Sequence, residues 1–130
     1  MTQHIIARIA IYLLSVIMII FGIYHFKEPR SMLVFVPTNI PGGITWVYIV
    51  GAAFILAAIS FILNRFVKVT AYLLALLLIV FVLTIHLPNF NHAGDADMRQ
   101  DALINMLKDT ALAAFALHIA GSADSHGMKY

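Results

Sequence analysis

Four long apolar runs, separated by shorter and more polar stretches, dominate this sequence. They cover residues 5–26, 44–63, 69–87 and 102–121. An α-helix rises about 1.5 Å per residue and a bilayer core is about 30 Å thick, so runs of roughly 20 residues can cross a membrane. The first run is too long for a signal-peptide core, and no small-x-small cleavage site follows it, so we interpret it as a retained helix. The pattern predicts an all-α, integral membrane four-helix bundle.

The first connection, residues 27–43, is too apolar for an ordinary loop and too short to span. Pro37 and Pro41 break it, and Gly42 and Gly43 follow. Such backbone is tolerated at membrane depth only where protein or water covers it. We therefore expect a proline-broken interfacial or re-entrant element between the first two helices.

The remaining connections are polar. A short basic turn with Arg65 and Lys68 makes the second and third helices antiparallel neighbours. Pro88 is expected to end the third helix, because proline cannot continue one, and residues 88–101 read as a solvated loop. A polar tail, 122–130, completes a single transmembrane domain over residues 1–130.

Composition supports the membrane assignment. The chain is 62% hydrophobic and 11% charged, against about 25% charged in soluble domains. It has no cysteine, which excludes disulfides, thiolate metal sites and iron–sulfur clusters within the chain. Its net charge of +2 is too small and scattered to indicate nucleic-acid binding.

Four crossings place both termini on one side of the membrane. The Lys and Arg counts near the helix ends are tied between the two sides, so the positive-inside rule does not decide on numbers alone. The short turn with Arg65 and Lys68 favours cytoplasmic N- and C-termini.

The step Lys108–Asp109 is the most informative polar feature. The apolar residues after it, 110–120, span only about 16 Å of helix, so the segment must recruit residues 102–107 to cross. That brings both charges below the membrane surface, where ionisable groups need partners. One interpretation is an ion pair that fixes helix register. The other is an anchor for a ligand headgroup, such as a quinone carbonyl or a lipid phosphate.

The other polar positions fall in the same leaflet when the helices alternate in direction. They are His25, Trp46, His86 and Asn89. Interfacial histidines and an aromatic belt are the plain interpretation of these residues. The functional interpretation has His25 and His86 converge with Asp109 on a ligand, because histidine changes protonation near neutral pH. No helix carries a histidine pair at i and i+4, and we expect no metal.

Several motifs in order resemble the DoxX family of small four-helix membrane proteins. They are His25-Phe26-x-x-Pro29, the proline-bearing connection, Gly51, and Leu107-Lys108-Asp109-x-Ala111-Leu112. The resemblance implies a protein of the bacterial inner membrane. Some members of that family are subunits of quinone-linked oxidoreductases, and others are associated with redox homeostasis. Phe54 stands where members often carry glutamate, which argues against proton handling in the middle of the membrane.

These observations lead to two functional hypotheses. The first is a quinone-interacting or accessory subunit in redox processes, with a lipophilic pocket in one leaflet and a quinone as its ligand. The chain has no self-contained catalytic motif, so it would be at most a subunit of an oxidoreductase. The second is a non-enzymatic assembly partner that uses the small residues Gly51, Ala53, Ala57 and Ser60. Expected partners are membrane lipids, a membrane or redox protein, or a second copy of the chain.

Overall fold

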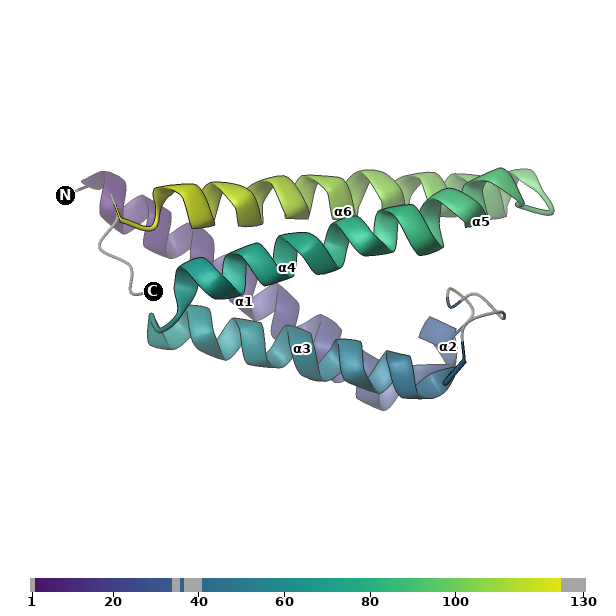
Figure 1. The fold of residues 1–130 in the computed structure, drawn as a ribbon, viewed down its shortest axis with the longest axis horizontal. Helices are drawn as coiled ribbons and strands as arrows, with labels where there is room; N and C mark the ends of the chain where they lie inside the picture. Colours follow the sequence, from purple (N-terminus) through teal and green to yellow (C-terminus); the bar gives the residue numbers. More distant parts are fainter. Residues whose placement is uncertain (1, 34–35, 37–40, 125–130) are drawn as a thin grey trace.

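A computed structural model describes residues 2–33, 36 and 41–124, and every element in these ranges is a helix (Figure 1). The predicted all-α, four-helix architecture is confirmed. The elements in chain order are α1 (Thr2–Lys27), α2 (Pro29–Leu33), α3 (Ile44–Leu63), α4 (Val67–Phe81), the π-helical turn η1 (Val82–His86), α5 (Leu87–Asn91) and α6 (Ala96–Ser122).

Among the described residues, four helical stretches are long and apolar enough to cross a membrane. They are His4–Lys27, Ile44–Leu63, Val67–Asn91 and Ala96–Ser122. Between 22% and 28% of the most apolar window of each is buried inside the protein, so most of its apolar residues face outwards. Exposed apolar surface of this extent needs lipid against it. The chain is a multi-pass membrane protein in contact with membrane lipids.

The helices form two close pairs, α1 with α3 and α4 with α6. The pairs meet at the end that holds both termini and diverge towards the end that carries α2 (Figure 1). Glycines bring α1 and α3 together. A Cβ added to Gly51 would lie 2.7 Å from the His25 Cβ, and one added to Gly22 would lie 2.9 Å from the Gly51 carbonyl oxygen. This approach leaves no room for larger residues.

The small-residue face expected to bind a partner is therefore largely used within the chain. Gly51 contacts α1. Ala53 lines an internal cavity, described below. Ser60 pairs with Thr70 of α4 through their hydroxyl groups, 2.8 Å apart.

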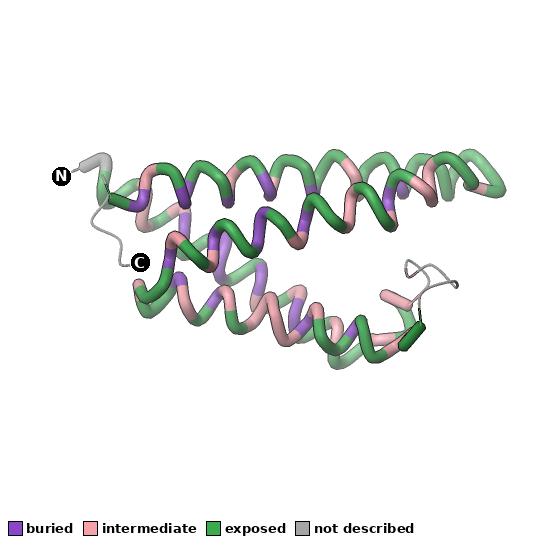
Figure 2. The backbone as a smooth tube through the Cα atoms, viewed as in Figure 1, coloured by how far each residue is buried: buried purple, intermediate pink, exposed green. Residues whose placement is uncertain are grey.

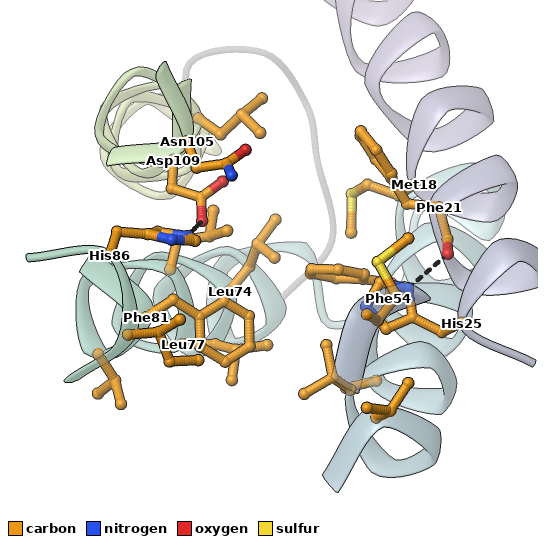
Figure 3. Close-up of a pocket in the computed structure, with 18 of the residues that line it drawn as sticks. Met18, Phe21, His25, Phe54, Leu74, Leu77, Phe81, His86, Asn105 and Asp109 are labelled. Atoms are coloured by element: carbon orange, nitrogen blue, oxygen red, sulfur yellow. Dashed lines mark hydrogen bonds and ion pairs between the residues drawn. The ribbon is translucent and has the colours of Figure 1, made fainter. Parts of the chain in front are cut away.

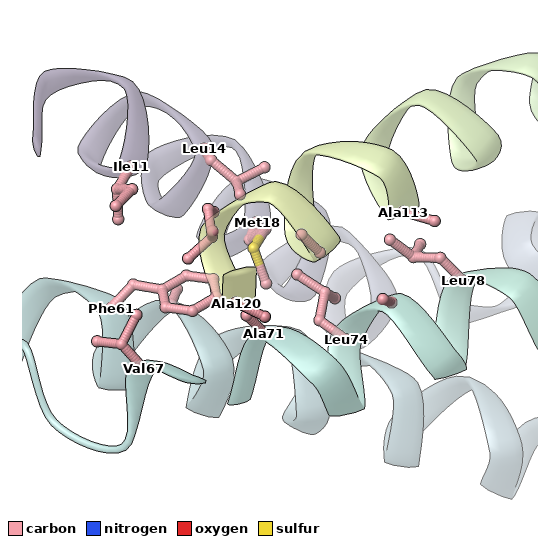
Figure 4. Close-up of a cluster of buried hydrophobic side chains, with 14 of the residues drawn as sticks. Ile11, Leu14, Met18, Phe61, Val67, Ala71, Leu74, Leu78, Ala113 and Ala120 are labelled. Atoms are coloured by element: carbon pink, nitrogen blue, oxygen red, sulfur yellow. The ribbon is translucent and has the colours of Figure 1, made fainter. Parts of the chain in front are cut away.

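The hydrophobic core lies where the two helix pairs meet. Buried residues gather towards the end with the termini, while the diverging end is mostly exposed (Figure 2). Side chains from all four long helices interdigitate there (Figure 4). Phe61 and Val67 are almost fully buried, and Ala71, Ala116 and Ala120 keep the helices close. The main core residues are Ile11, Leu14, Met18, Phe61, Val67, Ala71, Leu74, Leu78, Ala113, Ala116, Ile119 and Ala120.

A tight turn connects α3 to α4 and makes them antiparallel. Asn64 and Phe66 both adopt left-handed backbone with φ of 55°. The Ser60 hydroxyl donates to the Arg65 carbonyl across this turn. Asparagine tolerates the left-handed region better than most residues, and it ends α3 here as a C-cap.

The third span differs from the sequence expectation, which ended it at residue 87 before a loop over 88–101. The helical path continues through η1 into α5, and α6 already begins at Ala96. Proline is tolerated in the first turn of a helix, where Pro88 lies in α5. The Asp95 carboxylate accepts from the Met98 N–H at 2.8 Å and caps α6. The polar residues between 88 and 101 therefore lie mainly in α5 and in the first turns of α6.

The first connection contains the short helix α2, which begins at Pro29. The apolar and proline-broken part of that connection falls mainly on residues 34–35 and 37–40, which lie outside the described residues. Trp46 closes its far side, because its indole N–H donates to the Pro41 carbonyl at 2.6 Å. The expected interfacial element is thus seen only at its two ends.

Candidate functional site

A cavity of about 550 Å³ lies between the two helix pairs. Most of the residues around it are apolar, and they come from both pairs (Figure 3). On the side of the first pair the lining includes Leu14, Ile17, Met18, Phe21, His25, Trp46, Val47, Val50, Ala53 and Phe54. On the side of the second pair it includes Leu74, Leu77, Leu78, Phe81, Thr84, His86, Asn105, Lys108, Asp109 and Leu112.

A buried hydrogen-bonded pair forms the polar centre of one wall. His86 Nε2 lies 2.8 Å from Asp109 Oδ2. His86 is 8% exposed and Asp109 6% exposed. His86 ends the π-helical turn η1, and Asp109 lies in the middle of α6, so the contact joins two helices of one pair. A π-turn holds one residue more than an α-turn, and such turns recur at functional sites.

Lys108 extends this cluster towards the other helix pair. Its Nζ lies 3.6 Å from Asp109 Oδ1 and 3.5 Å from Asn105 Oδ1. The same ammonium lies 5.2 Å from the centroid of the Phe21 ring on α1, within the range of a cation–π contact. Its side chain is 42% exposed. The ammonium charge balances the Asp109 carboxylate next to it.

The second ring nitrogen of His86, Nδ1, is buried and has no hydrogen-bond partner among the described residues. A buried polar group without a partner costs about 1–3 kcal/mol. His86 as a residue is part of the cavity lining.

His25 lies on the opposite wall (Figure 3). Its Nδ1 is 2.6 Å from the Phe21 carbonyl oxygen one turn earlier in α1. The imidazole meets the Phe54 ring edge-on, with centroids 5.6 Å apart. Phe54 thus provides an aromatic surface beside His25.

The structure gathers most of the predicted site residues around one cavity. His25, Trp46, His86, Lys108 and Asp109 line it. Asn89, on α5, is absent from the described lining residues. The expected convergence of His25 with His86 and Asp109 takes a looser form, because His25 faces them across the cavity instead of contacting them.

Sequence analysis missed Asn105 and the aromatic lining. Asn105 precedes Asp109 by four residues and therefore lies on the same face of α6, a spacing that would have identified it. Phe21 and Phe81 gave no such signal, because phenylalanine is common throughout membrane helices. Among the described residues, no three His, Asp or Glu side chains are grouped to hold a metal ion. The site offers a ligand apolar contact and hydrogen bonds.

Comparison with known families gives a match over most of the chain. No curated protein and no solved structure matches the chain. A family described as a domain of unknown function (DUF8561) matches residues 14–120, which include every residue that lines the cavity. The chain belongs to the DUF8561 family.

Proposed function

We propose that this protein binds a lipophilic ligand with a hydrogen-bonding head, of the quinone class, inside the membrane. It would serve redox processes as a quinone-interacting or accessory subunit. The observation that carries the proposal is the combination of an apolar cavity of about 550 Å³ with one buried polar cluster on its wall.

The cavity suits this class of ligand in size and chemistry. Small-molecule sites commonly measure about 300–1,000 Å³ and combine apolar walls with a few placed polar groups. Here Phe21, Phe54 and Phe81 offer contact to a flat ring, while His86 and Asp109 provide the polar groups that orient a head. An isoprenoid or alkyl tail would make apolar contacts with the aliphatic lining residues.

The accessory role is the part of the proposal that concerns electron transfer. The sequence has no cysteine, and the described residues provide no metal cluster. Electrons moving to or from a bound quinone would need either a bound cofactor or a partner subunit with its own redox centre. The resemblance to DoxX proteins, some of which are subunits of quinone-linked oxidoreductases, supports the same assignment.

We place the protein in the bacterial inner membrane with both termini in the cytoplasm. The turn between α3 and α4, with Arg65 and Lys68, lies at the same end of the molecule as the two termini (Figure 1). A short basic connection favours the cytoplasmic side. The cavity would then lie towards the outer leaflet.

The test is mass spectrometry of organic extracts from the purified protein. Wild type is compared with Asp109→Asn, which keeps the side-chain shape, and with Asp101→Asn, an exposed carboxylate on the same helix. We expect a quinone in wild type and Asp101→Asn, and at least a tenfold loss in a folded Asp109→Asn protein. Bulk phospholipid alone in all three samples would overturn the proposal.

A further inference from the structure

We propose that a second cavity, between α3 and α4, is a binding subsite for the hydrocarbon tail of the ligand. We call it the side cavity, and its volume is about 220 Å³. The inference rests on the proposed function and specifies where each part of the ligand lies. The head occupies the cavity of about 550 Å³, beside His86 and Asp109, and a long tail passes between α3 and α4.

The side cavity adjoins the main one. Ala53 of α3 and Leu74 and Leu77 of α4 line both cavities. Figure 3 shows the two leucines on the side of the main cavity that α4 forms. The side cavity is smaller than the roughly 300–1,000 Å³ of sites that hold a whole small molecule. It is therefore suited to one part of a ligand whose remainder lies in the main cavity.

The chemistry of the side cavity fits a hydrocarbon. Beyond the three shared residues, its lining consists of Leu56, Ala57, Thr70 and Leu73. The Thr70 hydroxyl lies 2.8 Å from the Ser60 hydroxyl, which itself donates to the Arg65 carbonyl. Thr70 therefore donates its hydrogen to Ser60 and has none left for a ligand. The side cavity thus offers a ligand apolar contact and no free hydroxyl hydrogen.

The outer rim of the side cavity faces the lipid. Leu56 and Leu73 belong to its lining and are exposed, whereas Leu74 is buried. A chain that enters from the main cavity and continues outwards therefore reaches the bilayer. A tail longer than the side cavity can leave the protein there, so the cavity volume does not limit the length of the tail.

The position of the side cavity along α4 sets the reach that a tail needs. Leu77 precedes His86 by about two and a half helical turns, roughly 14 Å along the axis at about 1.5 Å per residue. Methyl and methoxy groups on a ring beside His86 do not extend that far, whereas a ring with a decyl chain does. Only ligands with a long tail should therefore use the subsite.

The first experiment compares decyl-ubiquinone with the same ring that carries hydrogen in place of the decyl chain. Binding is measured to the full chain in nanodiscs, and empty nanodiscs correct for partition into lipid. Ala57→Leu places a branched side chain in the side cavity, and Ala57 does not line the main cavity. The decyl ligand should bind at least fivefold more weakly to this variant, while the affinity of the tailless ring should change less than twofold.

The expected loss has a steric cause. Lipid tails are as apolar as the side cavity, so affinity for a hydrocarbon chain there depends on close packing, which an added side chain prevents. Ala111→Leu is the matched control, because Ala111 is exposed on α6 and lies outside the described lining of both cavities. It should leave both affinities unchanged.

A second measurement needs no variant. A decyl ligand with a diazirine at the end of its tail is photoactivated in wild type, and mass spectrometry identifies the labelled residues. We expect labels on Leu56 or Leu73, at the rim of the side cavity. An excess of decyl-ubiquinone should reduce this labelling at least fivefold, because a specific subsite is saturable and contact with bulk lipid is not.

The outcomes separate this inference from the proposed function. If wild type binds neither ligand above the empty-nanodisc background, the proposed function fails and the subsite fails with it. If both ligands bind but Ala57→Leu changes the two affinities equally, the ligand class stands and the subsite is wrong. Labels confined to α1 or α6, or labels that excess ligand does not reduce, lead to the same conclusion. Should Ala57→Leu fail to fold, the labelling decides alone.

Discussion

Asp109 shows at the scale of single residues how a membrane protein keeps a charge in its interior. The carboxylate is 6% exposed and has one partner on η1 and another in the preceding residue of α6. Removing a hydrogen bond to a buried charged group costs about 1.5–3 kcal/mol, because the group keeps its desolvation cost and loses a partner. Variants of the pair His86 and Asp109 therefore test how much this cluster contributes to folding as well as to binding.

His86→Leu should destabilise the protein by about 1.5–3 kcal/mol, because it leaves the Asp109 carboxylate without its shortest hydrogen bond. The free energy of unfolding is measured in mixed micelles by titration with a denaturing detergent. The double variant His86→Leu with Asp109→Leu should recover most of the loss, since no charge then remains buried. A single variant as stable as wild type would show that the pair contributes nothing to the fold.

The sequence predicted this cluster only in part. Helix length alone placed Lys108 and Asp109 below the membrane surface, and alternating helix directions placed His86 on the same side. The partner of Asp109 could not be assigned, because it depends on the π-turn that orients His86. No residue in Val82–His86 marks a π-turn in a single sequence.

Two local features of the helices determine where the walls of the cavity lie. On one side, Gly22 and Gly51 allow α1 to approach α3, which places His25 and Phe54 together. On the other, η1 interrupts the third span and brings His86 to Asp109. The apolar pattern predicted the ends of α3 correctly. It missed the continuation beyond Pro88, because proline usually ends a helix but is accepted in the first turn of α5.

Gly51→Ala should separate α1 from α3, because the added Cβ would lie 2.7 Å from the His25 Cβ. Overpacking of this kind costs about 1–3 kcal/mol. Thermal unfolding and ligand retention are measured together, and both should fall. Gly121→Ala is the matched control, since a Cβ there meets nothing within 4 Å. Equal behaviour of the two variants would contradict the role given to this contact.

Deletion of Thr84 should convert η1 into ordinary α-helix and turn His86 away from Asp109. The helix itself loses little, so helical content by circular dichroism should stay near that of wild type. Ligand retention should drop at least tenfold. Leu83→Ala keeps the chain length and the π-turn at an exposed residue outside the described cavity lining, and it should retain the ligand. Retention by the deletion variant would show that the extra residue does not position His86.

At the scale of the whole molecule, the two helix pairs share a core at one end and enclose a cavity towards the other. Figure 4 shows that Ala71 of α4 and Ala120 of α6 lie in this core beside Phe61 of α3. The candidate membrane spans of 20 to 27 residues extend from it. The four-helix topology followed from the sequence, but the divergence of the pairs did not. It depends on side-chain volumes at the core, which a hydrophobic pattern does not resolve.

Because the two pairs contact each other at the core and diverge beyond it, they can rotate relative to each other about the core. A small rotation of one pair about the core displaces the far ends of its helices, and the displacement grows with distance from the core. Ala71, fully buried there, does not line the cavity. Ala71→Val should therefore change the ligand affinity several-fold in a folded protein, measured in nanodiscs beside Ala111→Val, an exposed position on α6 outside the described cavity lining. A change of packing at the end of the molecule near the turn between α3 and α4 would alter the width of the cavity in the same way.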